Sequence, residues 1–179
     1  MENRRAIFLD RDGVINKAII RAGGFSSPWS LDEFEIIDEV EEVLKEFKKL
    51  EFLNIIITNQ PDIARGNLLL RELEKMHQII LERLPVDDIQ YCPHDDKDNC
   101  DCRKPKPGMI LRAAQKWNID LNHSYVIGDR WKDIKASKAA GCKAFLIRRE
   151  YNLDYQEDYD FEINNLKEVV EFIKKLENL

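Results

Sequence analysis

Short apolar runs alternate with amphipathic stretches along most of the chain. Residues 6–9 and 52–57 form apolar runs of the length of a buried strand, and a polar residue ends each run. Between them, the apolar residues of 40–50 recur at the spacing of one helix face. The same criteria predict strands at 6–9, 52–57, 88–91, 125–127, 143–147 and 160–163, and helices at 40–50, 70–84, 107–117, 131–140 and 166–176.

Strands that alternate with helices predict crossover connections and a mostly parallel sheet covered on both faces. The expected fold is therefore a doubly wound α/β domain. The chain has no repeat, no low-complexity tract and no Gly/Ser-rich linker, so we expect residues 1–179 to form a single domain. Ligands of such sheets bind at the carboxyl ends of the strands, near the point where the strand order reverses. The residues that directly follow the strands are therefore the first functional candidates.

The composition narrows the function classes. The 179 residues are 44% hydrophobic, which is enough for one core, and 28 Lys and Arg against 34 Asp and Glu give a net charge of −6. This balance argues against the broad basic surface of a nucleic-acid-binding protein. The apolar runs fall short of the roughly 18 residues of a membrane span, and the start of the chain shows no signal-peptide apolar region. We expect a cytoplasmic protein without a nucleic-acid or membrane partner.

Polar and acidic residues follow three of the predicted strands. Asp10 and Asp12 follow the first, Thr58 follows the second, and Asp129 follows the fourth. Each residue alone is typical of a turn or a helix cap. Two acidic sites that converge on one edge repel each other unless a cation lies between them, and Mg²⁺ prefers carboxylate oxygens. We therefore expect Asp10 and Asp129 to bind Mg²⁺.

This set of residues is complete for phosphoryl transfer. Asp10 beside Mg²⁺ stays ionised and can attack phosphorus, which forms an aspartyl-phosphate. Asp12 is placed to protonate the leaving oxygen and then to activate water. Thr58 and Lys104 supply a hydroxyl and a cation for the phosphoryl oxygens. The pattern predicts a Mg²⁺-dependent phosphomonoester hydrolase.

Three of the four cysteines lie within eleven residues. Cys92 with His94, and Cys100 with Cys102, form two ligand pairs with one intervening residue each. Three thiolates and one imidazole suit a tetrahedral structural Zn²⁺ site. A disulfide is the alternative, but it is disfavoured in a reducing compartment and strained between such close residues. Cys142 is expected to be a buried core thiol. The predicted zinc loop, 92–102, directly precedes Arg103 and Lys104 and would hold both in register.

Four motifs in this chain resemble those of the haloacid dehalogenase (HAD) superfamily, in the expected order. They are Asp10-Arg11-Asp12-Gly13-Val14, Thr58-Asn59-Gln60, Lys104-Pro105, and Gly128-Asp129 with Asp133. The resemblance spans 7–147 and implies a Rossmann-like HAD core with phosphatase activity. Only 16–30 and 59–103 could hold an insertion, so we expect no large cap domain.

The segment Cys-x-His…Cys-x-Cys-Arg-Lys-Pro narrows the resemblance to the family of heptose-bisphosphate and histidinol-phosphate phosphatases. Residues 63–66, Ile-Ala-Arg-Gly, resemble the heptose enzymes more closely. The resemblance implies a small phosphorylated metabolite as substrate, with removal of the 7-phosphate of heptose 1,7-bisphosphate in the synthesis of nucleotide-heptose, lipopolysaccharide or glycan precursors. Histidinol phosphate or another small sugar phosphate is the alternative. The implied substrate contacts are Asn59, Gln60, Arg65 and Arg103, and the implied Mg²⁺ site is Asp10 and Asp129 with the backbones of Asp12 and Arg130.

Two segments depart from the family pattern. Pro61-Asp62 stands where the family continues with Ser-Gly, and 21–29 differs from the expected substrate loop. A phosphoacceptor domain of the receiver type is the main non-enzyme alternative. It has no place for the zinc segment, and no Asp follows the third strand as its acceptor would. A second non-enzyme alternative is a zinc-organised interaction module with an inactive site. It would require that Asp10 or Asp12 cannot perform its catalytic role. We expect a monomer.

Other residues have open assignments. Phe25 and Trp29 could form a wall of the site or be loop aromatics anchored on the core. Trp131 is expected in helix packing, and His77 in a solvated or capping position. Asp133 could support the Mg²⁺ site, pair with Lys104, or be a solvated helix carboxylate.

Overall fold

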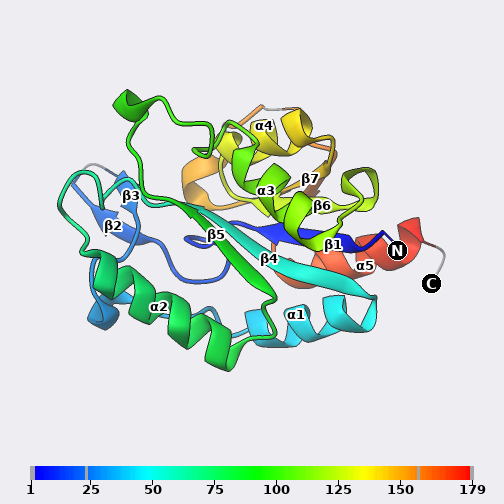
Figure 1. Ribbon diagram of the computed structural model, residues 1–179. Coiled ribbons are helices and arrows are strands. Elements are labelled where there is room, and N and C mark those ends of the chain that lie inside the picture. The colour runs from blue at the N-terminus through cyan, green and yellow to red at the C-terminus, as the bar shows by residue number, and fades with distance from the viewer. Residues whose placement is uncertain (1–2, 23, 157, 178–179) are drawn as a thin grey trace.

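The computed structural model describes residues 3–22, 24–156 and 158–177, and its centre is a six-stranded parallel sheet (Figure 1). The strand order is β5-β4-β1-β6-β7-β8, so the order reverses beside β1. All six predicted strands are confirmed, and the chain forms the expected doubly wound α/β fold. The strands are β1 (Arg5–Leu9), β4 (Phe52–Asn59), β5 (Asp88–Cys92), β6 (Tyr125–Gly128), β7 (Lys143–Ile147) and β8 (Phe161–Ile163).

Helices cover both faces of the sheet, and the five predicted helices are confirmed. Figure 1 shows α3 and α4 on one side of the sheet, and α1 and α2 on the other. Helix α5 packs against α1. No helix within the described ranges is both long and apolar enough to span a bilayer. The helices are α1 (Val40–Lys49), α2 (Leu70–Arg83), α3 (Gly108–Trp117), α4 (Trp131–Ala140) and α5 (Leu166–Leu176).

The central strand β1 has no exposed face, which explains why its sequence is a continuous apolar run. Because side chains alternate across a strand, Ile7 and Leu9 pack with α1 and α5, whereas Ala6 and Phe8 pack with α3 and α4. All four are fully buried. The residue that follows β1 therefore emerges from a rigid core at a fixed position.

A two-stranded antiparallel hairpin, β2 (Ile19–Arg21) and β3 (Gly24–Ser26), is the main element that the sequence pattern does not predict. Each strand has only three residues, too few for a recognisable alternation. In Figure 1 the hairpin lies at the end of the sheet where the strands finish. It occupies the first of the two places where a cap could be inserted.

Two predictions about single residues are resolved by the packing. Cys142 is buried, as expected. The prediction for His77 is wrong: its ring lies buried on α2, with Nε2 3.4 Å from the guanidinium of Arg11. Burial and the nearby Arg11 charge lower the pKa of His77 to about 3. The helical spacing of apolar residues identifies the buried face of α2. It does not show that Arg11, from the loop after β1, contacts His77 on this helix.

Phe47 tests the packing of α1 on the sheet. Its side chain is fully buried in the core shared with β1 and α5. We expect Phe47→Ala to lower the free energy of unfolding by about 3 to 5 kcal/mol, because it removes apolar area and leaves a cavity. Urea denaturation measures the change. Lys45→Ala on the same helix, at an exposed position, serves as the control and should change it by less than about 0.5 kcal/mol. A loss below about 1 kcal/mol for Phe47→Ala would contradict this packing.

Candidate active site

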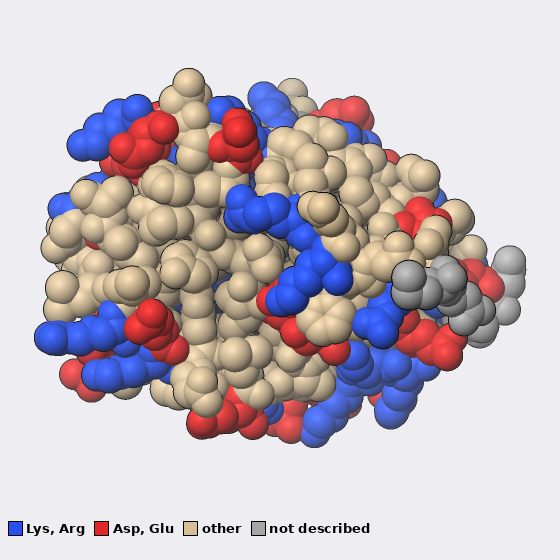
Figure 2. All heavy atoms as spheres, in the orientation of Figure 1, with Lys and Arg blue, Asp and Glu red and all other residues tan. Residues whose placement is uncertain are grey.

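The residues that follow β1, β4 and β6 meet at the carboxyl edge of the sheet. They border a cavity of about 250 Å³ beside the point where the strand order reverses. Its lining includes both acidic and basic side chains, among them Asp10, Asp12, Arg103, Lys104, Arg130 and Asp133. Around the face shown in Figure 2, acidic and basic side chains lie mostly side by side. The cavity thus combines opposite charges in one place.

Lys104 is the buried cation at the floor of this cavity. Its Nζ lies 2.8 Å from Asp10 Oδ1 and 2.6 Å from Asp133 Oδ1, and it donates to the Ile57 carbonyl at 2.8 Å. Burial alone would lower the pKa of Lys104, but the Asp10 and Asp133 carboxylates raise it above its ordinary value. Lys104 therefore stays charged. Of the three assignments left open for Asp133, the pairing with Lys104 is confirmed and the solvated carboxylate is wrong.

The backbone of Lys104 is fixed by Asn59, at the end of β4. Asn59 Nδ2 donates to the Lys104 carbonyl, and the Lys104 N–H donates to Asn59 Oδ1, both at 3.0 Å. The side-chain amide of Asn59 is therefore bonded to the backbone of Lys104. Asn59 also borders the cavity. This pair of bonds ties the segment after the cysteines to the central strands.

Three buried carboxylates, from Asp10, Asp129 and Asp133, bring ligand atoms within 4.8 Å of one another. Burial and the charge of Asp133 raise the pKa of Asp10 to about 8 and that of Asp129 to about 6. Asp129 Oδ2 accepts from the Tyr151 hydroxyl, whereas Asp129 Oδ1 is buried without a hydrogen-bond partner and lies 3.9 Å from Arg130 Nε. A hard cation would coordinate that oxygen and would also offset the repulsion between the carboxylates. This set of oxygens therefore fits Mg²⁺.

Asp12 lies beside these carboxylates in a different environment. Burial alone would raise its pKa, but the Arg11 guanidinium and the hydrogen bonds from Asn16 and Ser27 lower it. Gln60 Nε2 donates to Asp12 Oδ2 and to Thr58 Oγ1, both at 2.8 Å. The pKa values of the Asp10 and Asp12 carboxyl groups, two residues apart in sequence, are thus shifted in opposite directions.

Thr58 and Gln60 do not lie where the sequence interpretation puts them. Both are expected to contact substrate, yet both are fully buried, and neither borders the cavity. They lie behind Asp12 because Gln60 bonds to it and to Thr58. The motif indicates the correct strand end but not the direction of the side chains.

Arg65 and Arg103 border the cavity, and acidic residues of the loop 92–102 hold both. Arg65 donates to the Asp95 carboxylate at 2.7 and 2.8 Å. Arg103 Nε donates to Asp96 Oδ1 at 2.7 Å, and its NH1 donates to the His94 carbonyl at 3.3 Å. The two guanidinium groups are therefore preset at the rim by short ion pairs.

Aromatic residues contribute to the walls. Phe25 borders the cavity and packs on Tyr151, with ring centroids 3.9 Å apart, which favours the wall assignment for Phe25. Trp29 instead packs on the small core around Leu68, so it is the anchored loop aromatic. The helix-packing prediction for Trp131 is wrong, because its side chain borders the cavity at the start of α4.

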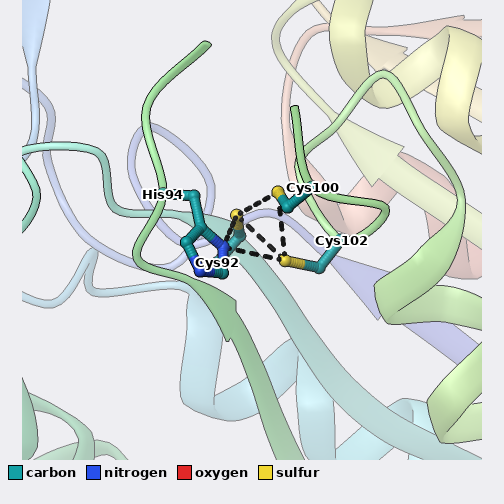
Figure 3. A group of neighbouring side chains, drawn as sticks. All are labelled: Cys92, His94, Cys100 and Cys102. Atoms are coloured by element: carbon teal, nitrogen blue, oxygen red, sulfur yellow. Dashed lines mark hydrogen bonds between the residues drawn. The ribbon is translucent and has the colours of Figure 1, made fainter. Parts of the chain in front are cut away.

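Cys92, His94, Cys100 and Cys102 converge in one cluster (Figure 3). The contacts from sulfur to sulfur or to His94 Nδ1 measure 3.2 to 3.6 Å. These distances exceed the S–S bond of about 2.05 Å in a disulfide, and all four cysteines are free. Tetrahedral zinc with Zn–S bonds of about 2.3 Å implies ligand separations of about 3.7 Å. The three sulfurs and one nitrogen therefore fit Zn²⁺.

Comparisons with known proteins place this site in a family. A family model described as HAD-hydrolase-like matches residues 101–169. The chain is 36% identical over 176 residues to D-glycero-β-D-manno-heptose-1,7-bisphosphate 7-phosphatase of Helicobacter pylori strain J99, covering 95% of this chain and 97% of that protein. The chain belongs to the HAD superfamily, in the heptose-bisphosphate phosphatase family. The Escherichia coli K12 protein of the same name is also 36% identical, covering 95% of this chain and 94% of the relative.

A solved structure supports the HAD fold along the whole chain. The D,D-heptose 1,7-bisphosphate phosphatase of B. bronchiseptica, complexed with magnesium and phosphate, superposes with a TM-score of 0.83 at 27% identity. The superposition covers 96% of this chain and 99% of that one. The expected Rossmann-like HAD core without a large cap domain is confirmed.

Some residues of the site are not identified by the HAD motifs. Tyr151, which bonds to Asp129, lies in a short 3-10 helix after β7 (Glu150–Asn152) and carries no sequence signal. Ser27 reaches Asp12 from the hairpin that the pattern does not predict. Asp133 has a signal, because it is the third residue of α4 and accepts from the Arg130 N–H at 3.1 Å in a capping arrangement.

The raised pKa of Asp10 predicts a specific pH dependence of stability. A carboxyl whose pKa is higher in the folded state binds a proton more tightly there, so ionisation destabilises the fold as pH rises. In metal-free buffer, we expect Asp10→Asn to become more stable than the wild type as pH rises from 5 to 8, by at most about 1.4 kcal/mol per pH unit. Urea denaturation across this range measures the difference, and comparison with the wild type removes the opposing contribution of His77.

Two controls accompany this measurement. Adding Mg²⁺ at pH 8 should stabilise the wild type and shrink the advantage of Asp10→Asn. Asp154→Asn makes the same chemical change at an exposed carboxyl outside the carboxylate cluster, so its difference from the wild type should be flat over pH 5 to 8. A flat difference for Asp10→Asn would show that the carboxylate cluster does not carry this electrostatic strain.

Proposed function

We propose that this chain removes the 7-phosphate of D-glycero-β-D-manno-heptose 1,7-bisphosphate in a Mg²⁺-dependent reaction through an aspartyl-phosphate. The observation that carries the proposal is the Asp10 carboxylate at the cavity floor, 2.8 Å from the Lys104 ammonium and beside Asp129. The substrate follows from the names of relatives that match almost the whole chain. In this proposal, residues 1–179 form one catalytic domain, and the enzyme acts as a monomer on a small cytoplasmic metabolite.

Asp10 is the nucleophile and Asp12 the acid/base in this proposal. An oxygen of Asp10 bonds to phosphorus as the bond to the ester oxygen breaks, and the proton of Asp12 passes to that oxygen. Asp12 then takes a proton from water, which attacks the aspartyl-phosphate and releases inorganic phosphate. Lys104 offsets the charge of the phosphoryl oxygens.

Mg²⁺ would be held by Asp10, Asp129 and the backbones of Asp12 and Arg130, with Asp133 beside them. When bound, it neutralises charge on the phosphoryl group. Support for this assignment comes from the buried Oδ1 of Asp129, which has no hydrogen-bond partner, and from the magnesium and phosphate of the B. bronchiseptica structure.

The rim residues have distinct proposed roles. Arg65 and Arg103 bind the second phosphate, since both border the cavity and both carry planar guanidinium groups suited to phosphate. Asn59 positions Lys104, and Gln60 positions Asp12 with Thr58 behind it. These assignments revise the expectation that Asn59, Gln60 and Thr58 bind substrate directly.

A phosphate-release assay tests the proposed reaction and its substrate. In Mg²⁺ buffer, the wild type should release phosphate from the β anomer of heptose 1,7-bisphosphate at least about tenfold more efficiently, in kcat/KM, than from the α anomer, histidinol phosphate or simple sugar phosphates. Asp10→Asn should lower the rate more than about 10³-fold, because an amide cannot act as the nucleophile.

Two different outcomes would contradict the proposal at two levels. A tenfold preference for histidinol phosphate would overturn the substrate but leave the mechanism. Appreciable turnover by folded Asp10→Asn would overturn the mechanism itself. Circular dichroism of the variant controls for folding.

We further propose that Cys92, His94, Cys100 and Cys102 hold a structural Zn²⁺. Four protein ligands leave no open position for chemistry, so the ion would fix the loop that leads into Arg103 and Lys104. Elemental analysis should find about one zinc per chain. Cys100→Ser should lower both the zinc content and the thermal stability, whereas Cys142→Ser should leave the zinc content unchanged because its thiol lies outside the cluster. A zinc-free preparation with full activity would remove this assignment.

A further inference from the structure

Four residues donate hydrogen bonds to Asp12, and one of them differs from the rest. Asp12 Oδ1 accepts from the Arg11 guanidinium at 2.9 Å and from Asn16 Nδ2 at 3.0 Å. Asp12 Oδ2 accepts from Gln60 Nε2 and from Ser27 Oγ, both at 2.8 Å. Arg11, Asn16 and Gln60 are fully buried, whereas Ser27 borders the cavity. Ser27 is therefore the partner of Asp12 that lies on the substrate side.

The hydroxyl of Ser27 also differs chemically from its neighbours. The guanidinium and amide N–H groups can only donate, so they favour an ionised Asp12. A hydroxyl can rotate, and it can donate to a carboxylate or accept from a carboxylic acid. Gln60 and Ser27 both hold Oδ2, but among the described partners of Asp12 it is the Ser27 hydroxyl that does so from the cavity side.

The loop that carries Ser27 is held before substrate arrives. The Arg21 guanidinium stacks on the Trp29 ring, with its central carbon 3.7 Å from the ring centroid, and donates to the Ser27 carbonyl at 3.4 Å. Glu33 accepts from Arg21 at 2.6 Å and from the Trp29 N–H at 2.8 Å. These contacts link the hairpin to the loop before α1, so the Ser27 hydroxyl reaches Asp12 from a braced backbone.

We propose that Ser27 is a positioning residue that keeps Asp12 Oδ2 directed at the ester oxygen of the substrate. The proposal rests on the proposed phosphatase function. As the bond from phosphorus to the ester oxygen breaks and Asp10 bonds to phosphorus, the proton of Asp12 Oδ2 passes to the ester oxygen. Ser27 holds Oδ2 on the cavity side before and after this transfer. This role for Ser27 gives a function to the 21–29 loop, which departs from the family pattern.

Leaving groups of different basicity separate positioning from a merely structural role. An alkoxide leaving group needs the proton, whereas p-nitrophenolate leaves without it. The value of kcat/KM reports the first transfer, to Asp10, and so isolates this step. The test compares Ser27→Ala with the wild type on p-nitrophenyl phosphate and on the sugar phosphate hydrolysed fastest in the panel above. We expect a fall of at least about tenfold for the sugar phosphate and of less than about threefold for p-nitrophenyl phosphate.

Two further variants make the test specific. Ser27→Thr keeps the hydroxyl and should restore the ratio of the two kcat/KM values to within about threefold of the wild type. Ser30→Ala removes a hydroxyl three residues further along, which does not border the cavity and makes no capping hydrogen bond, and should leave that ratio unchanged. Equal falls on both substrates, or no fall for Ser27→Ala, would overturn the role of Ser27 alone. A wild type that releases phosphate from neither substrate would overturn the proposed function and this role with it.

Discussion

One buried ammonium group among three buried carboxylates is the interaction on which the site depends. Lys104 Nζ contacts Asp10 and Asp133, and Asp129 lies close enough to share a cation with both. Charges buried at this depth are costly unless they are paired and hydrogen-bonded. With Lys104 and the Arg130 guanidinium, which lies 3.9 Å from Asp129 Oδ1, two cations face three carboxylates, and the missing hydrogen bond of that Oδ1 marks the remaining imbalance. The fold tolerates this imbalance because the strands that carry it are buried on both faces and cannot relax.

The same constraint explains why so much of the chain serves to place Lys104. Its backbone is bound to Asn59 at the end of β4, and its segment begins at Cys102, in the cluster of three sulfurs and one imidazole. A flexible lysine would swing toward solvent, where an ammonium is better hydrated. Holding its backbone from two directions removes that freedom, so the side chain remains under the carboxylates.

The sequence predicts the sheet and the acidic residues well because both depend on local patterns. Apolar runs define the strands, and Asp10 and Asp129 follow them directly, so the topology alone brings them together. The direction of the Gln60 side chain could not be predicted. Gln60 directly follows β4, where the regular alternation of side chains along the strand ends. The contact of His77 with Arg11 and that of Ser27 with Asp12 join segments far apart in sequence. Neither segment has a pattern that specifies its partner.

Charge balance at the rim also bears on which ligands the cavity accepts. Arg65 and Arg103 border the cavity, but each is already paired at 2.7 Å with a carboxylate of the loop 92–102. Under the proposed function, a phosphate at this rim would compete with Asp95 and Asp96 for the two guanidinium groups, and its affinity would be reduced by those pairings. A neutral polyol cannot compete with either carboxylate, whereas a doubly charged phosphate can. Under the proposed function, this rim of preset ion pairs would therefore favour substrates with a second phosphate over those with one, although the cavity has no large cap to enclose them.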